Sequence, residues 1–257
     1  PSRLEEMRAA ARADMRRSLQ VPPAMIEAIG DDTVHIDPYE TSAAWAYDLD
    51  WRPVPVFQLY AAYTHDLDRL NADDLAAGDA PRWILRQAVT RIGDRGRENE
   101  APSYTIAMFC NYAETMHSRR WQLLRRTPGR CGSPRELGSA QAAPNELVPV
   151  PAGRPDDLVY ATFALDLPLR TRLRSLLYKP RELPLLVLND NYGTRFAAAL
   201  APGDFLMWVP PTLGYTDYAS GFGAGTMRLA SVPTGFRVTF RAVSMAPPPA
   251  GTVDVGR

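Results

Sequence analysis

The sequence predicts an α+β protein in which a small α/β sandwich with a mainly parallel sheet precedes an antiparallel, jelly-roll-like β-sandwich. Between residues 31 and 85, short apolar runs alternate with segments that begin with helix-capping residues, the order typical of a parallel α/β sheet. Beyond residue 157, runs of strand-like residues follow one another between turns rich in Pro and Gly, which is typical of antiparallel sheets.

Composition places the chain among folded globular proteins. It has 257 residues, of which 46% are hydrophobic and 23% are charged, enough to bury a substantial core. The formal net charge is zero, so no overall field attracts nucleic acid and we expect no nucleic-acid partner. No apolar run in the sequence reaches the 18 or so residues of a membrane-spanning helix.

Four segments follow from the patterning. We expect a lead-in helix within residues 1–30, an α/β module over 31–126, an extended connector over 127–157 and the β-sandwich module over 158–257. Residues 3–19 place Leu4, Met7, Ala11 and Met15 on one helical face, as in a helix that packs by one side. The connector is predicted from its Pro, Gly, Ser and Ala content and its lack of any period.

In the α/β module the predicted strands are short apolar runs, at residues 34–36, 54–57, 83–85 and 121–124. Asp37 is expected to cap a helix that starts at Pro38, with Glu40 as the reciprocal member of a capping box. Thr64 is expected to cap the next helix, and residues 103–116 are expected to form another. In the second module we predict strands at residues 158–167, 185–189 and 236–241, the last because apolar and polar residues alternate strictly.

Polar and aromatic residues gather where these strands end, the edge at which open α/β sheets bind ligands. A second group lies on a long loop of the β-module. The candidate ligand-binding residues are Asp37, Gln58, Tyr60, Tyr63, Thr64, Tyr215 and Tyr218. Tyrosine rings suit the C–H faces of sugars, and amides and carboxylates suit their hydroxyls. The alternative is that Asp37 only caps a helix and that the tyrosines only cover the core.

No catalytic or metal-binding pattern stands out. The sequence lacks a GxSxG nucleophile motif and a phosphate-binding loop, and its three histidines are scattered, so we assign no catalytic residue, no metal site and no cofactor. A small α/β hydrolase or transferase that uses Asp37, Gln58, Tyr63 and His65 is the alternative in which the domain is an enzyme.

The only two cysteines are Cys110 and Cys131. Without a CxxC pattern they do not predict zinc. They are consistent either with a disulfide in an oxidising compartment or with two thiols in the cytosol.

One stretch resembles a known group of proteins. Residues 52–75, RPVPVFQLYAAYTHDLDRLNADDL, and residues 80–85, APRWIL, are similar to a segment in the C-terminal soluble part of large bacterial polytopic membrane proteins of GT-C glycosyltransferase-like type. Residues 171–180 and 203–211 resemble the same proteins.

The resemblance implies an extracytoplasmic domain that is tethered by transmembrane helices outside this sequence and that contacts them. It also favours a Cys110–Cys131 bridge, and it implies a non-catalytic role in which the domain positions or recognises a cell-envelope saccharide or lipid-linked sugar. A purely structural or dimerisation domain is the remaining alternative.

Overall fold

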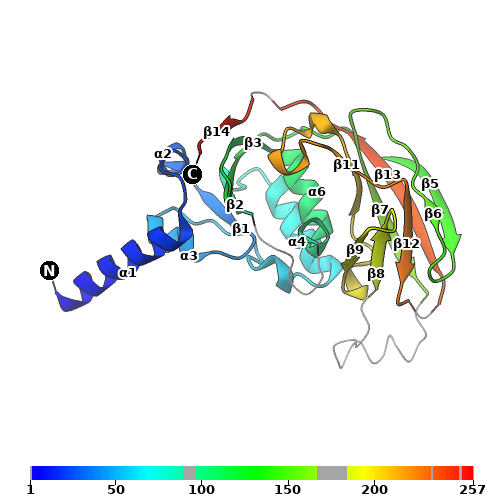
Figure 1. Cartoon of the computed structure of the whole chain (residues 1–257), viewed down its shortest axis with the longest axis horizontal. Helices are drawn as coiled ribbons and strands as arrows, with labels where there is room; N and C mark the ends of the chain where they lie inside the picture. The colour runs from blue at the N-terminus through cyan, green and yellow to red at the C-terminus, as the bar shows by residue number, and fades with distance from the viewer. Residues whose placement is uncertain (1, 89–95, 167–183, 233, 249–250, 257) are drawn as a thin grey trace.

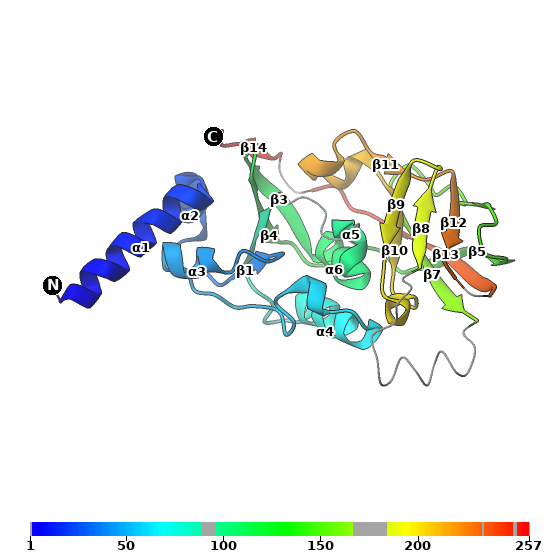
Figure 2. The same cartoon turned by 60° about the horizontal axis from the view of Figure 1, so that its bottom comes forward.

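Mixed helices and strands in several sheets confirm the α+β class. The computed structural model describes the chain except residues 1, 89–95, 167–183, 233, 249–250 and 257. A mixed sheet, a pair of central helices and two antiparallel sheets follow one another across the molecule, and the N-terminal helix projects from the end with the mixed sheet (Figures 1 and 2). None of the described helices is long and apolar enough to cross a membrane.

The first sheet has five strands, in the spatial order β1 (Val34–Asp37), β2 (Trp83–Gln87), β4 (Trp121–Arg126), β3 (Tyr112–His117) and β14 (Val253–Asp254). β1 runs parallel to β2 and β14 parallel to β3, whereas β4 is antiparallel to both of its neighbours. The prediction of a mainly parallel sheet is therefore wrong. Only three residues separate β3 from β4, and so short a connection can only return the chain antiparallel.

Residues 54–57 do not form the predicted strand. Pro53 and Pro55 lack the backbone N–H groups that a strand in the sheet would donate. Instead, Asn71 of the following helix pairs with this segment: the Val56 backbone N–H donates to Asn71 Oδ1 at 2.8 Å, and Asn71 Nδ2 donates to the Val56 carbonyl at 3.0 Å. A side-chain amide thus takes the place of a neighbouring strand.

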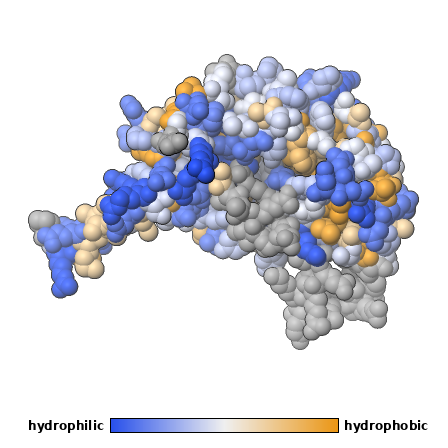
Figure 3. All heavy atoms as spheres, in the orientation of Figure 1, coloured by the Kyte–Doolittle hydropathy of each residue, from blue (hydrophilic) through white to orange (hydrophobic). Residues whose placement is uncertain are grey.

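Six α-helices are described: α1 (Arg3–Leu19), α2 (Pro23–Ile29), α3 (Ser42–Tyr47), α4 (His65–Ala76), α5 (Arg97–Glu100) and α6 (Pro102–Asn111). The helix over residues 3–19 and the Thr64 cap of α4 are confirmed, and Thr64 Oγ1 accepts from the Leu67 backbone N–H. The predicted packing face of the N-terminal helix is not buried, since Leu4 is 56% exposed and Met7 is 60% exposed. α6 ends five residues earlier than predicted, and the chain continues as β3. α1 is mostly exposed, and hydrophilic residues cover much of its projecting surface (Figure 3).

The other two sheets are antiparallel and share one core. One has the order β11 (Phe222–Gly223), β10 (Phe205–Val209), β7 (Asp157–Leu165), β13 (Phe236–Ser244) and β5 (Arg135–Ala142). The other has the order β6 (Val148–Pro149), β12 (Thr226–Ala230), β8 (Leu185–Leu188) and β9 (Tyr192–Arg195). Buried residues of both sheets, among them Phe163, Phe205 and Leu186, form one hydrophobic cluster.

Residues 127–157, expected to be an extended connector, contain β5 and β6. β5 pairs with β13 along its whole length although its sequence, RELGSAQA, is small and polar. Because it is an edge strand that pairs through its backbone, it needs little apolar signal of its own.

A second cluster joins the mixed sheet, α6 and the opposite face of the five-stranded sheet, through residues such as Ile84, Phe109 and Tyr160. The segment after β10 lies over this junction in three short pieces, the 3₁₀ turns η3 (Pro211–Leu213) and η4 (Thr216–Tyr218) and strand β11.

Candidate functional site

Arg86 on β2 is the centre of a buried polar network, with only 3% of its side chain exposed. Its Nε donates to Asp37 Oδ2 on the neighbouring strand at 3.1 Å. Its Nη1 donates to Gln122 Oε1 on β4 at 3.0 Å and to Asp217 Oδ2 in η4 at 3.2 Å. A buried guanidinium needs such partners to offset the loss of its hydration. The network therefore fastens η4 to the mixed sheet.

Asp37 belongs to this network and is not a helix cap. Its Oδ1 accepts from the Tyr104 hydroxyl of α6 at 3.1 Å, and α3 begins only at Ser42, after Thr41 in the N-cap position. The predicted capping box at Asp37 is therefore wrong, because the buried guanidinium engages the carboxylate. Burial, with the nearby Asp37 charge, raises the pKa of Tyr104 well above its ordinary value, so its hydroxyl stays protonated and donates.

Glu114 on β3 forms the second branch of the network. Its Oε2 accepts from Gln122 Nε2 at 2.9 Å and from the Thr216 backbone N–H at 3.0 Å, and its Oε1 accepts from the Thr216 hydroxyl. His117 Nδ1 lies 3.6 Å from Glu114 Oε1. Burial is the main cause that raises the pKa of Glu114. The carboxyl group thus binds its proton more tightly in the folded chain than in the unfolded chain.

This raised pKa gives a testable pH dependence. A raised folded-state pKa contributes stability below the unfolded value of about 4.3, and the contribution is lost as the pH rises through the folded pKa. We expect Glu114→Gln to lose less stability than the wild type between about pH 4 and pH 8. The amide oxygen still accepts from Gln122 and Thr216, and its NH₂ donates to the Thr216 hydroxyl. Urea unfolding of both proteins across this range measures the difference, and parallel profiles would contradict it.

Tyr215 and Tyr218, predicted on a ligand-binding loop, pack on α6. Tyr215 is buried, its hydroxyl donates to the Tyr112 carbonyl at 3.1 Å, and its ring centre lies 5.0 Å from that of Phe109. The Tyr218 ring contacts Phe109 at 5.5 Å and Phe222 at 6.5 Å. Tyr215 is therefore a core residue, and neither ring projects from a free loop.

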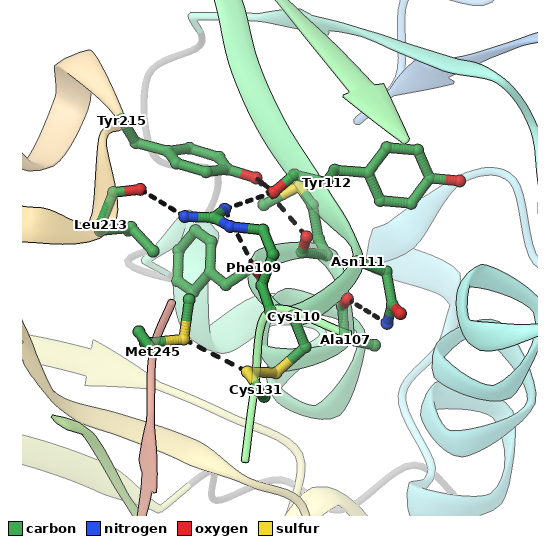
Figure 4. Close-up of a disulfide and its surroundings, with 11 residues drawn as sticks. Ala107, Phe109, Cys110, Asn111, Tyr112, Cys131, Leu213, Tyr215 and Met245 are labelled. Atoms are coloured by element: carbon green, nitrogen blue, oxygen red, sulfur yellow. Dashed lines mark hydrogen bonds between the residues drawn. A yellow bond between two sulfur atoms is a disulfide. The ribbon is translucent and has the colours of Figure 1, made fainter. Parts of the chain in front are cut away.

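Cys110 and Cys131 form a disulfide beside this contact, with their Cα atoms 5.0 Å apart (Figure 4). Cys110 lies near the end of α6, and Cys131 follows Arg130, whose side chain is buried. Arg130 donates to the carbonyls of Phe109 and Tyr112 at the end of α6 and, at 2.7 Å, to that of Leu213. The disulfide and Arg130 together hold the end of α6 against the segment that follows β10.

Three of the remaining candidates are Gln58, Tyr60 and Tyr63. Together with Tyr39 and Phe57, which the sequence did not single out, we call them the aromatic surface. Tyr63 is 57% exposed, and Phe57 and Tyr60 are each 38% exposed. The Tyr60 hydroxyl donates to Gln58 Oε1 at 2.7 Å, and the Tyr60 ring centre lies 5.4 Å from that of Tyr39. Among these candidates the structure therefore brings Gln58 and Tyr60 together and leaves Tyr63 on the surface.

Buried residues anchor the aromatic surface from below. Leu59 and Ala62 are buried within and beside the 3₁₀ turn η1 (Leu59–Ala61). Thr64 ends the segment as the cap of α4, so its hydroxyl already accepts a hydrogen bond. Asp37 is not part of this surface, because its carboxylate lies in the buried network.

The described contacts do not assemble the catalytic set of the enzyme alternative. Asp37 bonds Arg86 and Tyr104, Tyr63 is exposed, and His65 lines a different cleft at the start of α4. Within the described ranges, no group of three or more His, Cys, Asp or Glu side chains is arranged to hold a metal ion.

Sequence reasoning missed Arg86 and Glu114. Arg86 directly follows the apolar run Trp83–Leu85, and this position is the only sequence signal for its burial, since β2 extends through it to Gln87. Glu114 lay in a predicted helix, so its sheet neighbours were not foreseeable.

Comparison of the chain with protein-family models, with curated proteins and with solved structures finds no match.

Proposed function

We propose that this chain is a non-catalytic extracytoplasmic domain of a membrane glycosyltransferase-like protein, and that it recognises or positions a cell-envelope saccharide through the aromatic surface. The observation that carries the proposal is the exposure of Tyr63, Tyr60 and Phe57 beside Gln58 on one short segment. The exposure of three aromatic side chains between residues 57 and 63 supplies apolar surface of the kind that binding sites use.

The chemistry of this surface suits a sugar. Tyrosine rings pack on the C–H face of a pyranose, while hydroxyl and amide groups bond its hydroxyls. Tyr60 is already oriented by its hydrogen bond to Gln58 and its contact with Tyr39. A side chain that is ordered before binding loses less conformational entropy when the ligand arrives.

Two further features support the location and fold. The Cys110–Cys131 disulfide favours an oxidising compartment, in line with a domain attached to its own transmembrane portion. The two antiparallel sheets with a common core support the jelly-roll-like β-sandwich, which we propose as the finer description of the second module.

Tyr63→Ala is the variant that tests saccharide recognition. We expect saturable binding to cell-envelope glycans or lipid-linked sugars, weakened about fivefold or more in the variant, since stacking on an exposed ring contributes about 1 kcal/mol or more. Because Tyr63 is exposed, its removal should change the free energy of unfolding by no more than about 0.5 kcal/mol. A glycan array followed by titration calorimetry measures the binding.

Trp45→Ala is the matched control, because Trp45 is an aromatic of similar exposure (41%) on α3. We expect it to bind as the wild type does. A folded wild-type sample that binds no saccharide would overturn the proposal in favour of a structural or dimerisation domain, and glycosyl transfer or hydrolysis by the isolated chain would overturn its non-catalytic part.

A further inference from the structure

A cleft of about 550 Å³ lies between the start of α4 and the five-stranded sheet. α4 contributes His65 and Arg69, β13 contributes Arg237, Thr239 and Arg241, and Asp204 precedes β10. The cleft is separate from the buried Arg86 network and from the tyrosines of the aromatic surface.

The strand register explains why the sheet is hollowed here. On β13, Arg237, Thr239 and Arg241 alternate with Val238 and Phe240, which are buried in the core on the other face. Their side chains therefore rise from one face at intervals of about 7 Å. On β7, Ala164 lies opposite Arg237 and Thr162 lies opposite Thr239. Because the β7 side chains beside Arg237 and Thr239 are short, this part of the sheet face stays open, whereas Arg241 lies opposite the buried Tyr160.

The charges of this cleft are unbalanced. Three arginines and one histidine line it against one acid, Asp204. Arg241 Nη1 donates to the Thr162 hydroxyl at 3.2 Å, and within the described part of the chain neither Arg237 nor Arg241 forms an ion pair with a carboxylate. Arg69 pairs with Asp73 on the exposed side of α4.

Two acids lie near the arginines of this cleft, Asp204 in its lining and Asp68 beside Asp204. Burial raises the pKa of Asp204, and Arg69, Arg241 and His65 oppose that shift. Asp68, which also faces Asp204, already accepts the backbone N–H groups of Ser103 and Tyr104.

We propose that this cleft binds a saccharide that carries a phosphate or carboxylate group, with the anionic group on Arg237 and Arg241. Guanidinium groups match both anions through paired N–H donors. The hydroxyls of Thr162 and Thr239 and the carboxyl group of Asp204 are then available to the sugar hydroxyls. The sugar part of the ligand rests on the proposed function, whereas its anionic part rests on the cleft itself.

The position of the cleft agrees with this assignment. His65 follows Tyr63 by two residues, across the Thr64 cap of α4. The aromatic surface and the cleft therefore border the same end of one helix. A glycan of more than one sugar can contact Tyr63 with a neutral residue and the cleft with an acidic one.

The test is titration calorimetry on the whole chain with four probes: a hexose 6-phosphate, a hexuronate, the corresponding neutral hexose and inorganic phosphate. We expect saturable binding of at least one anionic sugar, at least about tenfold tighter than that of the neutral hexose or of inorganic phosphate. Arg237→Gln and Arg241→Gln should each weaken it about tenfold or more, as loss of a charge-assisted hydrogen bond does. The stronger of the two anionic sugars identifies the anion.

Arg228→Gln is the control, because Arg228 lies on β12 of the other antiparallel sheet and pairs with Asp190. It should bind the sugar as the wild type does, and thermal unfolding should show all three variants folded. Three results would each overturn the proposal: no binding of either anionic sugar, wild-type affinity in both cleft variants, or equal affinity for inorganic phosphate and the hexose phosphate.

The same titration separates this proposal from saccharide recognition by the aromatic surface. If Tyr63→Ala binds the anionic sugar normally while Arg241→Gln does not, the cleft binds the anionic sugar without help from the aromatic surface. The cleft proposal then holds even if saccharide recognition by the aromatic surface fails. If Tyr63→Ala loses neutral glycans and neither Arg237→Gln nor Arg241→Gln weakens binding of the anionic sugar, the aromatic surface stands and the cleft proposal fails.

Discussion

Arg86→Leu should lower the free energy of unfolding by about 3–5 kcal/mol, the cost of breaking a buried ion pair by removing one partner. The carboxylate of Asp37 would remain buried, and among the described contacts the Tyr104 hydroxyl would be its one remaining donor. Asp217 and Gln122 would lose their bonds to the guanidinium as well. We expect the contact between η4 and the mixed sheet to loosen first. Urea unfolding gives the loss of stability.

Two further variants sharpen this test. Arg82 is a half-exposed arginine one residue before β2, and its side chain lies 4.0 Å from that of Asp32. We expect Arg82→Leu to lower the free energy of unfolding by no more than about 1 kcal/mol. The double variant Arg86→Leu/Asp37→Leu should be more stable than Arg86→Leu alone, because it removes the unpaired charge. A loss below about 1 kcal/mol in Arg86→Leu would mean that the network contributes little to the fold.

Removal of the disulfide, as Cys110→Ala/Cys131→Ala, is expected to lower the free energy of unfolding by about 3 kcal/mol. The bridge closes a loop whose ends are 21 residues apart, and in the chain-entropy account such a loop loses about this much freedom when unfolded. The segment after β10 should also become more accessible to hydrogen exchange, because Arg130, next to Cys131, holds Leu213 and the end of α6.

Reductant supplies the matching control for the disulfide. Dithiothreitol should destabilise the wild type by a similar amount and should leave the double variant unchanged. A wild type purified under oxidising conditions that unfolds identically with and without reductant would contradict the bridge. It would also remove the structural feature that supports the proposed extracytoplasmic location.

Several elements were predictable because their signals are local. The helix over residues 3–19, the Thr64 cap and the apolar strands at Val34, Trp83 and Trp121 all lie where the sequence predicts them. Capping groups act within one turn, and apolar periodicity reflects burial of one face. Capping residues and apolar periodicity therefore predict a helix or strand without knowledge of the elements that pack against it.

Other elements depend on partners far away in the sequence. β5 is a strand because β13 pairs with it, and Val54–Phe57 is not a strand because Asn71 satisfies its backbone. Neither partner lies within the range over which local propensity acts.

The candidate sites divide in the same way. Gln58 and Tyr60, which are only two residues apart, are joined by a hydrogen bond, whereas their assignment to a binding site stays a prediction. The sequence did not distinguish the exposed Tyr63 from the buried Tyr215, because a tyrosine suits either environment. The sequence also did not predict the cleft, because side chains from β13, β7 and α4 line it together and these elements are far apart in the chain.

By itself, the sequence determined the α+β class, the capped helix α4 and the aromatic segment that precedes it. Only the tertiary structure decided that Asp37 binds Arg86 rather than a helix end, that the first sheet is mixed, and that three arginines line one cleft. The physical reason is that capping and periodicity are properties of neighbouring residues. The partner of a buried charge and the register of a strand are set by the whole packed chain.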